Sequence, residues 1–395
     1  MRYTTLLLAG IICSLNLCAQ ETLSLSQAIE AGLANNFDIR IERGNVDVAR
    51  VNNTWGEAGV FPSLTFTAIG SYDNRDTREV INPFAFLART ETYQMQPAVN
   101  LNWNLLSLKN IQISKRRLEQ LQAESQGNAS IVIANSLQSI ILGYYVAVLE
   151  KERLRQFEEQ MKLSRDKYEK LKIKKEIGGA VTSDLLLEEG NYLTDSTNFL
   201  NQQLQYENAI TNLNFLIGIP EPATRYILSD SLDTETMEVD LIDLIDLMEQ
   251  ENVDVKTQYI TQSVLGLDVQ QSRWNRFPTL SIGGNYTFTR NTQDVSDWPE
   301  QFRQNPDGST FSTGNNENTN WGLNFTISFN LFDGGRINRA IQRALIQENI
   351  GETRVDRLKT SLRRDLKQAI DQYNTRKQLY LINQRRSAAA NQMNR

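Results

Sequence analysis

The chain has 395 residues, no histidine, two cysteines and a formal net charge of −6. Without histidine, and with both cysteines (Cys13 and Cys18) near the N-terminus, it lacks the groups for Ser-His or Cys-His nucleophilic chemistry and the usual zinc and copper ligands. The negative charge disfavours nucleic acid as a partner, because nucleic acid normally needs a basic face. We therefore expect no enzyme, no cofactor and no metal site.

Residues 1–20 have the pattern of a secretory signal peptide. Arg2 supplies a positive charge, Leu6–Leu17 is apolar, and the small Ala19 precedes a polar segment. Twelve residues are too few to span a bilayer as a helix. We expect cleavage after Ala19 or Gln20; the alternative is a buried N-terminal helix.

Cys18 raises the question of lipidation, but the preceding Leu15–Leu17 lacks the small residues usual before a lipidated cysteine. After this leader no uninterrupted apolar run approaches eighteen residues, so no transmembrane helix is expected. An exported chain without one is either soluble in the periplasm or a β-barrel protein.

The rest of the chain contains an internal repeat. Two pairs of matching segments lie 216 residues apart: Asn36–Ile39 with Asn252–Val255, and Phe61–Leu64 with Phe277–Leu280. A third pair, Trp103–Leu106 with Phe329–Phe332, lies 226 residues apart. The larger third offset predicts a longer loop in the second copy. We expect a first repeat at 21–219, an acidic connector at 220–240 and a second repeat at 241–395.

Each copy is expected to run helix, strand, loop, strand, long helix. In the first copy the helices are predicted at Ser26–Val60, Leu108–Ile177 and Thr182–Ile217, with Ser26 and Glu30 as the first cap. The helix Leu108–Ile177 would be about 105 Å long, far longer than a globular domain needs. The long helix of the second copy carries a coiled-coil seam of Val355, Leu358, Leu362, Leu366, Ala369 and Tyr373.

Four segments without charge change to a period of two and predict strands: Ser63–Tyr72, Tyr93–Leu108, Thr279–Thr289 and Thr319–Phe332. They form two β-hairpins, 63–106 and 279–332, with loops at Asp73–Thr92 and Arg290–Asn318. Alternation of apolar and neutral polar residues is typical of membrane strands. A soluble sheet with one buried face is the alternative. The predicted lipid-facing residues are Trp103, Trp321, Leu323, Phe325, Ile327 and Phe329.

Four strands cannot close a barrel, and open strand edges are not tolerated in lipid. The chain is therefore expected to oligomerise. Three copies would supply twelve strands and a closed duct.

These features together resemble the outer membrane efflux protein (TolC-like) family. The resemblance rests on Phe61-Pro62, Phe277-Pro278, the strand exit Asn330–Arg336, and Gly178 followed by Asp184-Leu185. It implies a homotrimer with a 12-stranded outer-membrane β-barrel continued by a long periplasmic α-helical barrel, working with a periplasmic adaptor (membrane fusion) protein and an inner-membrane pump.

The resemblance also implies that the turn between the helices of the first copy is a tip that contacts the adaptor. The tip residues are Gly178, Gly179, Ala180, Val181, Thr182, Ser183 and Asp184. A plain helix–helix turn explains the same residues. The second tip would fall near position 404, beyond Arg395, so the C-terminal part of the second repeat is expected to be missing, and no pore-closing acidic residue can be assigned.

The function expected is a passive exit duct of a tripartite efflux or type I secretion system, in the outer membrane of a Gram-negative bacterium with a large periplasmic portion. It would pass exported small molecules or proteins. The alternative is a periplasmic coiled-coil adaptor or scaffold, which would not need four charge-free strands.

Overall fold

The computed structural model describes residues 22–81, 84–105, 108–221, 226–232, 238 and 240–393. The predicted signal peptide lies outside these residues, and the predicted connector is described only in part. The chain divides into two units. We call them the helical unit (residues 1–47, 125–256 and 360–395) and the sheet unit (residues 48–124 and 257–359).

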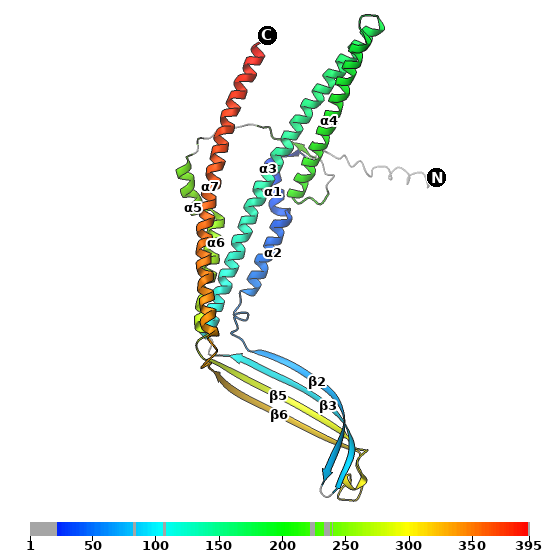
Figure 1. Ribbon diagram of the computed structural model, residues 1–395, viewed down its shortest axis with the longest axis vertical. Helices are drawn as coiled ribbons and strands as arrows, with labels where there is room; N and C mark the ends of the chain where they lie inside the picture. The colour runs from blue at the N-terminus through cyan, green and yellow to red at the C-terminus, as the bar shows by residue number, and fades with distance from the viewer. Residues whose placement is uncertain are drawn as a thin grey trace, which may run out of the picture. The chain divides into compact units, whose positions relative to one another are not determined.

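The described elements are seven α-helices, six strands and a short 3-10 helix (Figure 1). In chain order they are β1 Thr22–Leu23, α1 Leu25–Asn35, α2 Phe37–Asn52, β2 Ser63–Ile81, β3 Phe84–Asn104, α3 Leu108–Glu176, α4 Thr182–Leu216, β4 Ile227–Leu228, α5 Leu241–Glu251, α6 Val253–Trp274, β5 Thr279–Asp294, η1 Glu300–Phe302, β6 Thr313–Ser328 and α7 Arg336–Met393.

The core of the helical unit lies where α1, α3 and α4 meet. Its members are largely or wholly removed from solvent: Leu23, Ala28, Ile140, Tyr144, Ala147, Val148, Ile210, Leu213, Ile217 and Leu228. The Tyr144 hydroxyl donates a 2.9 Å hydrogen bond to the Leu23 carbonyl, which ties α3 to the short parallel pair of β1 and β4. Burial raises the pKa of Tyr144, so the hydroxyl stays neutral and keeps this bond.

The first helix differs from the prediction. The predicted Ser26–Val60 is two helices broken at Asn36, and the second ends at Asn52. The N-cap is Ser24, which forms a capping box with Gln27, rather than Ser26 with Glu30. Asn36 ends α1 and starts α2: its side-chain oxygen accepts from the Ile39 amide at 3.1 Å.

The two long helices agree closely with the prediction, since α3 and α4 each end one residue earlier than predicted. The stretch Lys109–Glu176 contains an 18-residue window of mean hydropathy 1.7, of which 28% is buried. By length and composition alone this helix could cross a membrane, contrary to the expectation of no such helix. The same helix supplies Ile140, Tyr144, Ala147 and Val148 to the core, which accounts for apolar residues in it.

The helices at the start of the two predicted repeats agree in spacing, and the first helix of each repeat also agrees in length. Helices α5 and α6 begin 216 residues after α1 and α2, and α5 has the same 11-residue length as α1. Asn252 separates them as Asn36 separates the first pair, and its side-chain oxygen accepts from the Val255 amide at 3.1 Å. The same helix–asparagine–helix arrangement therefore occurs at the start of both predicted repeats.

The sheet of the sheet unit has four antiparallel strands in the order β2-β3-β5-β6 (Figure 1). It joins two hairpins through the pair β3–β5. The predicted loop Asp73–Thr92 was wrong, because β2 and β3 stay paired as far as Ile81 and Phe84. The loop Arg290–Asn318 is shorter than predicted as well, since β5 extends to Asp294 and β6 begins at Thr313.

Candidate functional site

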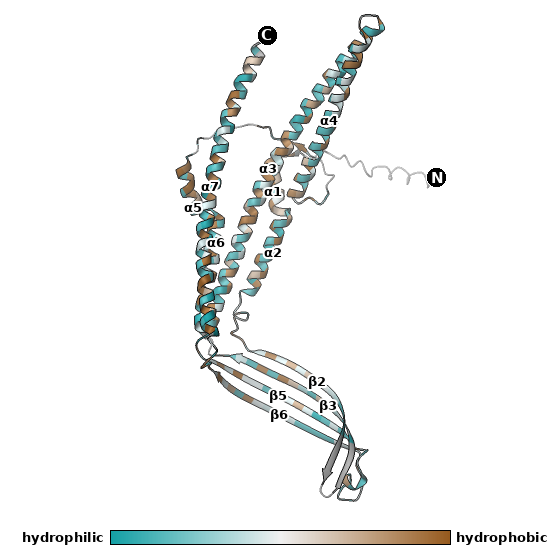
Figure 2. Ribbon diagram, viewed as in Figure 1, coloured by the Kyte–Doolittle hydropathy of each residue, from teal (hydrophilic) through white to brown (hydrophobic). Residues whose placement is uncertain are grey.

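One face of the sheet is apolar across all four strands, and we call it the apolar face. Residues that are paired in an antiparallel sheet point to the same side. One row across the four strands consists of Phe66, Val99, Tyr286 and Trp321. A second row consists of Leu64, Leu101, Gly284 and Leu323. The apolar sets predicted separately on each strand therefore share one face. Figure 2 shows the alternation of polar and apolar residues along the strands.

The apolar face is open to solvent in this chain. On β6, Trp321 is 72% exposed, Phe325 69% and Ile327 69%. Side chains of this size are normally buried, and a contiguous exposed apolar surface marks contact with another protein or with a membrane.

The opposite face, called the polar face, carries hydroxyls and amides. Its rows include Ser63, Asn102, Gly283 and Asn324, and Thr65, Asn100, Asn285 and Gly322. From Ser63 to Ser71 on β2, Gln94 to Asn104 on β3, Thr279 to Thr289 on β5 and Asn318 to Ser328 on β6, no residue of this face is charged. A soluble sheet usually carries lysine, arginine or glutamate on its wet face.

Asparagines lie over glycines on the polar face. A Cβ placed on Gly283 would overlap the side-chain amide of Asn324, its paired residue. In the next row the relation is reversed, and a Cβ on Gly322 would come within 3.1 Å of the Asn285 side-chain oxygen. The glycines therefore leave room on the polar face for the side chains of the paired asparagines.

Charge begins at the hairpin ends of the strands, beyond the uncharged rows. Arg290 of β5 pairs with Glu317 of β6 at 3.6 Å, and Arg89 of β3 pairs with Asp76 of β2 at 3.2 Å. The uncharged stretch of each strand is about 10 to 13 residues, which suits a tilted membrane strand.

Two of the predicted lipid-facing residues have different surroundings from the rest. Trp103 is on the apolar face but only half-exposed, because its indole N–H donates to the Val60 carbonyl at 2.9 Å. Phe329 is 55% exposed but lies beyond the end of β6, which stops at Ser328 rather than at Phe332. Trp321, Leu323, Phe325 and Ile327 lie within the strand.

The predicted tip joins α3 to α4 in the helical unit. Gly178 has φ of +80°, a conformation that glycine adopts without strain. Its amide donates to the Lys175 carbonyl at 3.0 Å, and the Gly179 amide donates to Lys174 at 2.8 Å. This pair of hydrogen bonds is the Schellman motif, which ends a helix sharply and lets the chain reverse.

The tip is exposed and rich in aliphatic side chains. Ile177 is 79% exposed, Val181 61% and Leu187 65%. Thr182, Ser183 and Asp184 form the first turn of α4 and are exposed, whereas Ala180 is half-buried. Below the tip, Tyr168 of α3 stacks on Tyr192 of α4 with ring centroids 6.1 Å apart, which holds the two helices together.

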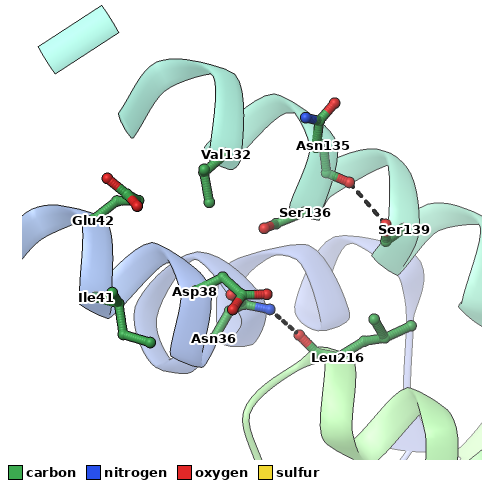
Figure 3. Close-up of a pocket in the computed structure, with 9 residues that line it drawn as sticks. All are labelled: Asn36, Asp38, Ile41, Glu42, Val132, Asn135, Ser136, Ser139 and Leu216. Atoms are coloured by element: carbon green, nitrogen blue, oxygen red, sulfur yellow. Dashed lines mark hydrogen bonds between the residues drawn. The ribbon is translucent and has the colours of Figure 1, made fainter. Parts of the chain in front are cut away.

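The helical unit also contains a polar pocket of about 310 Å³ between α2, α3 and the end of α4 (Figure 3). Asp38 and Glu42 line one side, and Ser136 and Ser139 line the other. At the edge of the pocket the side-chain amide of Asn36 donates a 2.8 Å hydrogen bond to the Leu216 carbonyl. Among the described residues there is no group of three or more histidine, cysteine or carboxylate side chains arranged to hold a metal ion.

Part of the chain matches a known protein family. Residues 244–394 match the sequence model of the family described as outer membrane efflux protein. The resemblance to the outer membrane efflux protein (TolC-like) family is therefore confirmed. No curated protein matches the sequence.

Solved structures show the same fold over most of the chain. The outer-membrane channel OprN aligns with TM-score 0.64 and 15% identity, covering 90% of this chain and 75% of its own. The Campylobacter jejuni outer membrane channel CmeC aligns with TM-score 0.61 and 16% identity, covering 87% and 70%. CusC aligns with TM-score 0.60 and 16% identity, covering 91% and 79%. At these identities the comparison establishes the fold, a mixed helix and sheet fold of TolC-like channels.

Proposed function

We propose that this chain is one protomer of a passive outer-membrane exit duct for an efflux or type I secretion system. The observation that carries the proposal is the register of the sheet, which gathers the predicted apolar positions within the strands on one face and neutral polar residues on the other. Lipid on one side and water on the other is the environment that this division fits. The family match supports the same reading.

The sheet supports assembly as well. Its two outer strands, β2 and β6, each have one side without a partner strand among the described residues. Unpaired backbone groups are costly in lipid, and eight strands are the usual minimum for a barrel. Three copies give a closed barrel of twelve strands by joining β6 of one to β2 of the next. The α-helices then form a periplasmic helical barrel.

An internal duplication explains why the sheet has two equivalent hairpins. The helix–asparagine–helix unit at 25–52 recurs at 241–274 with the same 11-residue first helix. The sheet order β2-β3-β5-β6 places the two hairpins side by side. A gene encoding one hairpin with its helices, doubled in tandem, produces this arrangement.

We assign the exposed tip, Gly178 to Asp184, to contact with a periplasmic adaptor. Val181 within the tip, and Ile177 and Leu187 beside it, are aliphatic side chains exposed to water, as expected of a docking surface. An inner-membrane pump would then supply the energy for export, and this chain the path. No residue is proposed to be catalytic.

Membrane extraction and mass measurement test the proposal. The protein should fractionate with outer membranes, require detergent for extraction, and purify with the mass of three chains. Extraction by salt or alkaline wash alone would contradict it and favour a periplasmic adaptor or scaffold. A detergent-extracted protein that is stably monomeric would contradict the trimer and leave the membrane assignment standing.

A further inference from the structure

Large apolar side chains gather where the strands of the sheet unit join the helices, a region that we call the strand roots. They lie two residues before β2 or β5, or within four residues after β6. In order, with their exposed fractions, they are Phe61 67%, Phe277 56%, Phe329 55%, Leu331 90% and Phe332 90%. Girdles of aromatic residues flank the apolar band of membrane β-barrels.

Positive charge accompanies these apolar residues at the roots of β5 and β6. Arg273, Arg276, Arg336 and Arg339 are all exposed there, in a chain whose net charge is −6. The one carboxylate in the segments 273–277 and 329–339 is Asp333. Its oxygens accept from the Gly335 and Ile337 amides, each at 2.8 Å, so it caps the start of α7.

A pocket of about 310 Å³ lies at this root and combines both features. Arg276, Leu331, Phe332, Asp333 and Asn338 are among its lining residues, and the Asp333 carboxylate accepts hydrogen bonds from the Gly335 and Ile337 backbone N–H groups. The Arg276 guanidinium donates one hydrogen bond, at 2.8 Å, to the Asn338 side-chain oxygen. A guanidinium has five N–H groups in a planar fork, and that fork matches the oxygens of a phosphate.

We propose that this pocket binds a phospholipid, with its phosphate on Arg276 and its acyl chains against Leu331 and Phe332. The apolar residues continue from Phe332 and Phe329 to Ile327 and Phe325, so acyl chains leaving the pocket run onto the apolar face. An anionic headgroup complements the arginines, and hydrocarbon complements the 90% exposed side chains. The inference rests on the proposed function, since the roots then lie at the periplasmic leaflet.

Native mass spectrometry of the detergent-solubilised protein tests the site. The probes are dioleoyl phosphatidylglycerol and dioleoylglycerol, which has the same acyl chains and no phosphate. Soluble glycerol phosphate, added as a competitor, distinguishes a lipid site from a site for free phosphate. The variants are Arg276→Gln, which removes the cation, and Arg276→Lys, which keeps it. The control is Arg290→Gln, an arginine near the hairpin end of β5, the strand that follows Arg276.

The expected result is one retained phosphatidylglycerol per chain, little dioleoylglycerol, and no displacement by glycerol phosphate. Arg276→Gln should weaken retention about tenfold, the effect of losing one charge-assisted contact, with Arg276→Lys intermediate and Arg290→Gln unchanged. Equal retention by Arg276→Gln and the wild type would overturn the site.

A second variant separates lipid binding from contact with another protomer. Phe332→Ser should lower retention of lipid and leave the oligomeric state in lipid-free detergent unchanged. Loss of the oligomer would mean that the root packs against a neighbouring protomer, and the proposal would be wrong. A protein that needs no detergent for extraction would instead overturn the proposed function itself.

Discussion

The first-copy helices and the sheet use apolar residues in opposite ways. In the helical unit Ile140, Tyr144 and Leu213 have no exposed surface. In the sheet unit Trp321, Phe325 and Ile327 are about as large and each about 70% exposed. Both sets follow a regular period in the sequence. The period therefore predicts the element and its apolar side, whereas burial depends on whether the same chain supplies the covering surface.

A comparison of α1 with α5, the first helices of the two predicted repeats, shows the same dependence of burial on a covering surface. In α1, Ala28 is fully buried and Gly32 is buried against Ile140. In α5, Leu244 and Met248 occupy the corresponding positions and are only half-buried, and the described helix has no buried residue. The cover that α3 and α4 give to α1 has no counterpart over α5 among the described residues.

Truncation of a core residue should have the largest effect on stability. Ile140→Ala removes a fully buried side chain and should lower the free energy of unfolding by about 2–5 kcal/mol. The matched control Ile382→Ala, in α7 where the side chain is 59% exposed, should change it by less than about 0.5 kcal/mol. Thermal melts in detergent compare them; equal losses would mean that α7 is covered as fully as α3.

A charge on the apolar face should impair membrane insertion without affecting the helices. Phe325→Arg puts a charge where lipid is proposed, at a cost of about 2–4 kcal/mol near the bilayer midplane. Asn324→Arg, on the neighbouring polar face, should be tolerated far better. The amount of protein in the outer-membrane fraction measures both, and equal damage would show that the two faces are wrongly assigned.

Gly218 tests how α1 and α4 fit in the first-copy core. Its φ is +76°, and an added Cβ would overlap the backbone of Asn35. Gly218→Ala should destabilise the protein by about 1–3 kcal/mol. Gly44→Ala, in α2 with nothing near its Cβ, should be neutral or stabilise by up to about 1 kcal/mol. If both changes behave alike in thermal melts, the close approach of Asn35 is not a constraint.

The smallest expected effect is a pH dependence at the start of α7. The backbone N–H of Ile337, followed by that of Gly335, lowers the pKa of Asp333. The pKa of Asp333 is therefore lower in the folded than in the unfolded protein. The stability that its carboxylate contributes is present above the unfolded pKa of about 3.9 and is lost as the pH falls through the folded pKa. The difference in melting temperature between the wild type and Asp333→Asn should therefore be constant down to about pH 4 and shrink as the pH falls further. A constant difference would mean that Asp333 does not cap α7.

Much of the architecture could be predicted from the sequence. Helix bounds at α3 and α4 were within one residue, because Gly178 and Pro220 interrupt long helical periods. The common apolar face followed from the period of two on each strand. The ends of β2 and β3 were missed, since the charged residues from Asp73 onward resemble a loop although the backbone stays paired.

The break at Asn36 was missed for a different reason. No proline or glycine marks it, and asparagine occurs within helices at modest cost. The break is fixed by contacts from far along the chain: the Asn36 amide donates to the Leu216 carbonyl, and Gly218 lies against Asn35. The root pocket was missed similarly, because Arg276 and Asn338 are 62 residues apart and only folding brings them together.

Cysteine labelling along β6 tests the central claim, lipid on one face and water on the other, most directly. Both cysteines of the chain, Cys13 and Cys18, lie in the predicted signal peptide, so single cysteines can be introduced without competition. In intact outer membranes a water-soluble maleimide should label cysteines at Asn320, Asn324 and Thr326 and spare those at Trp321, Leu323 and Phe325. Uniform labelling along the strand would contradict the membrane assignment, and the reverse pattern would exchange the two faces.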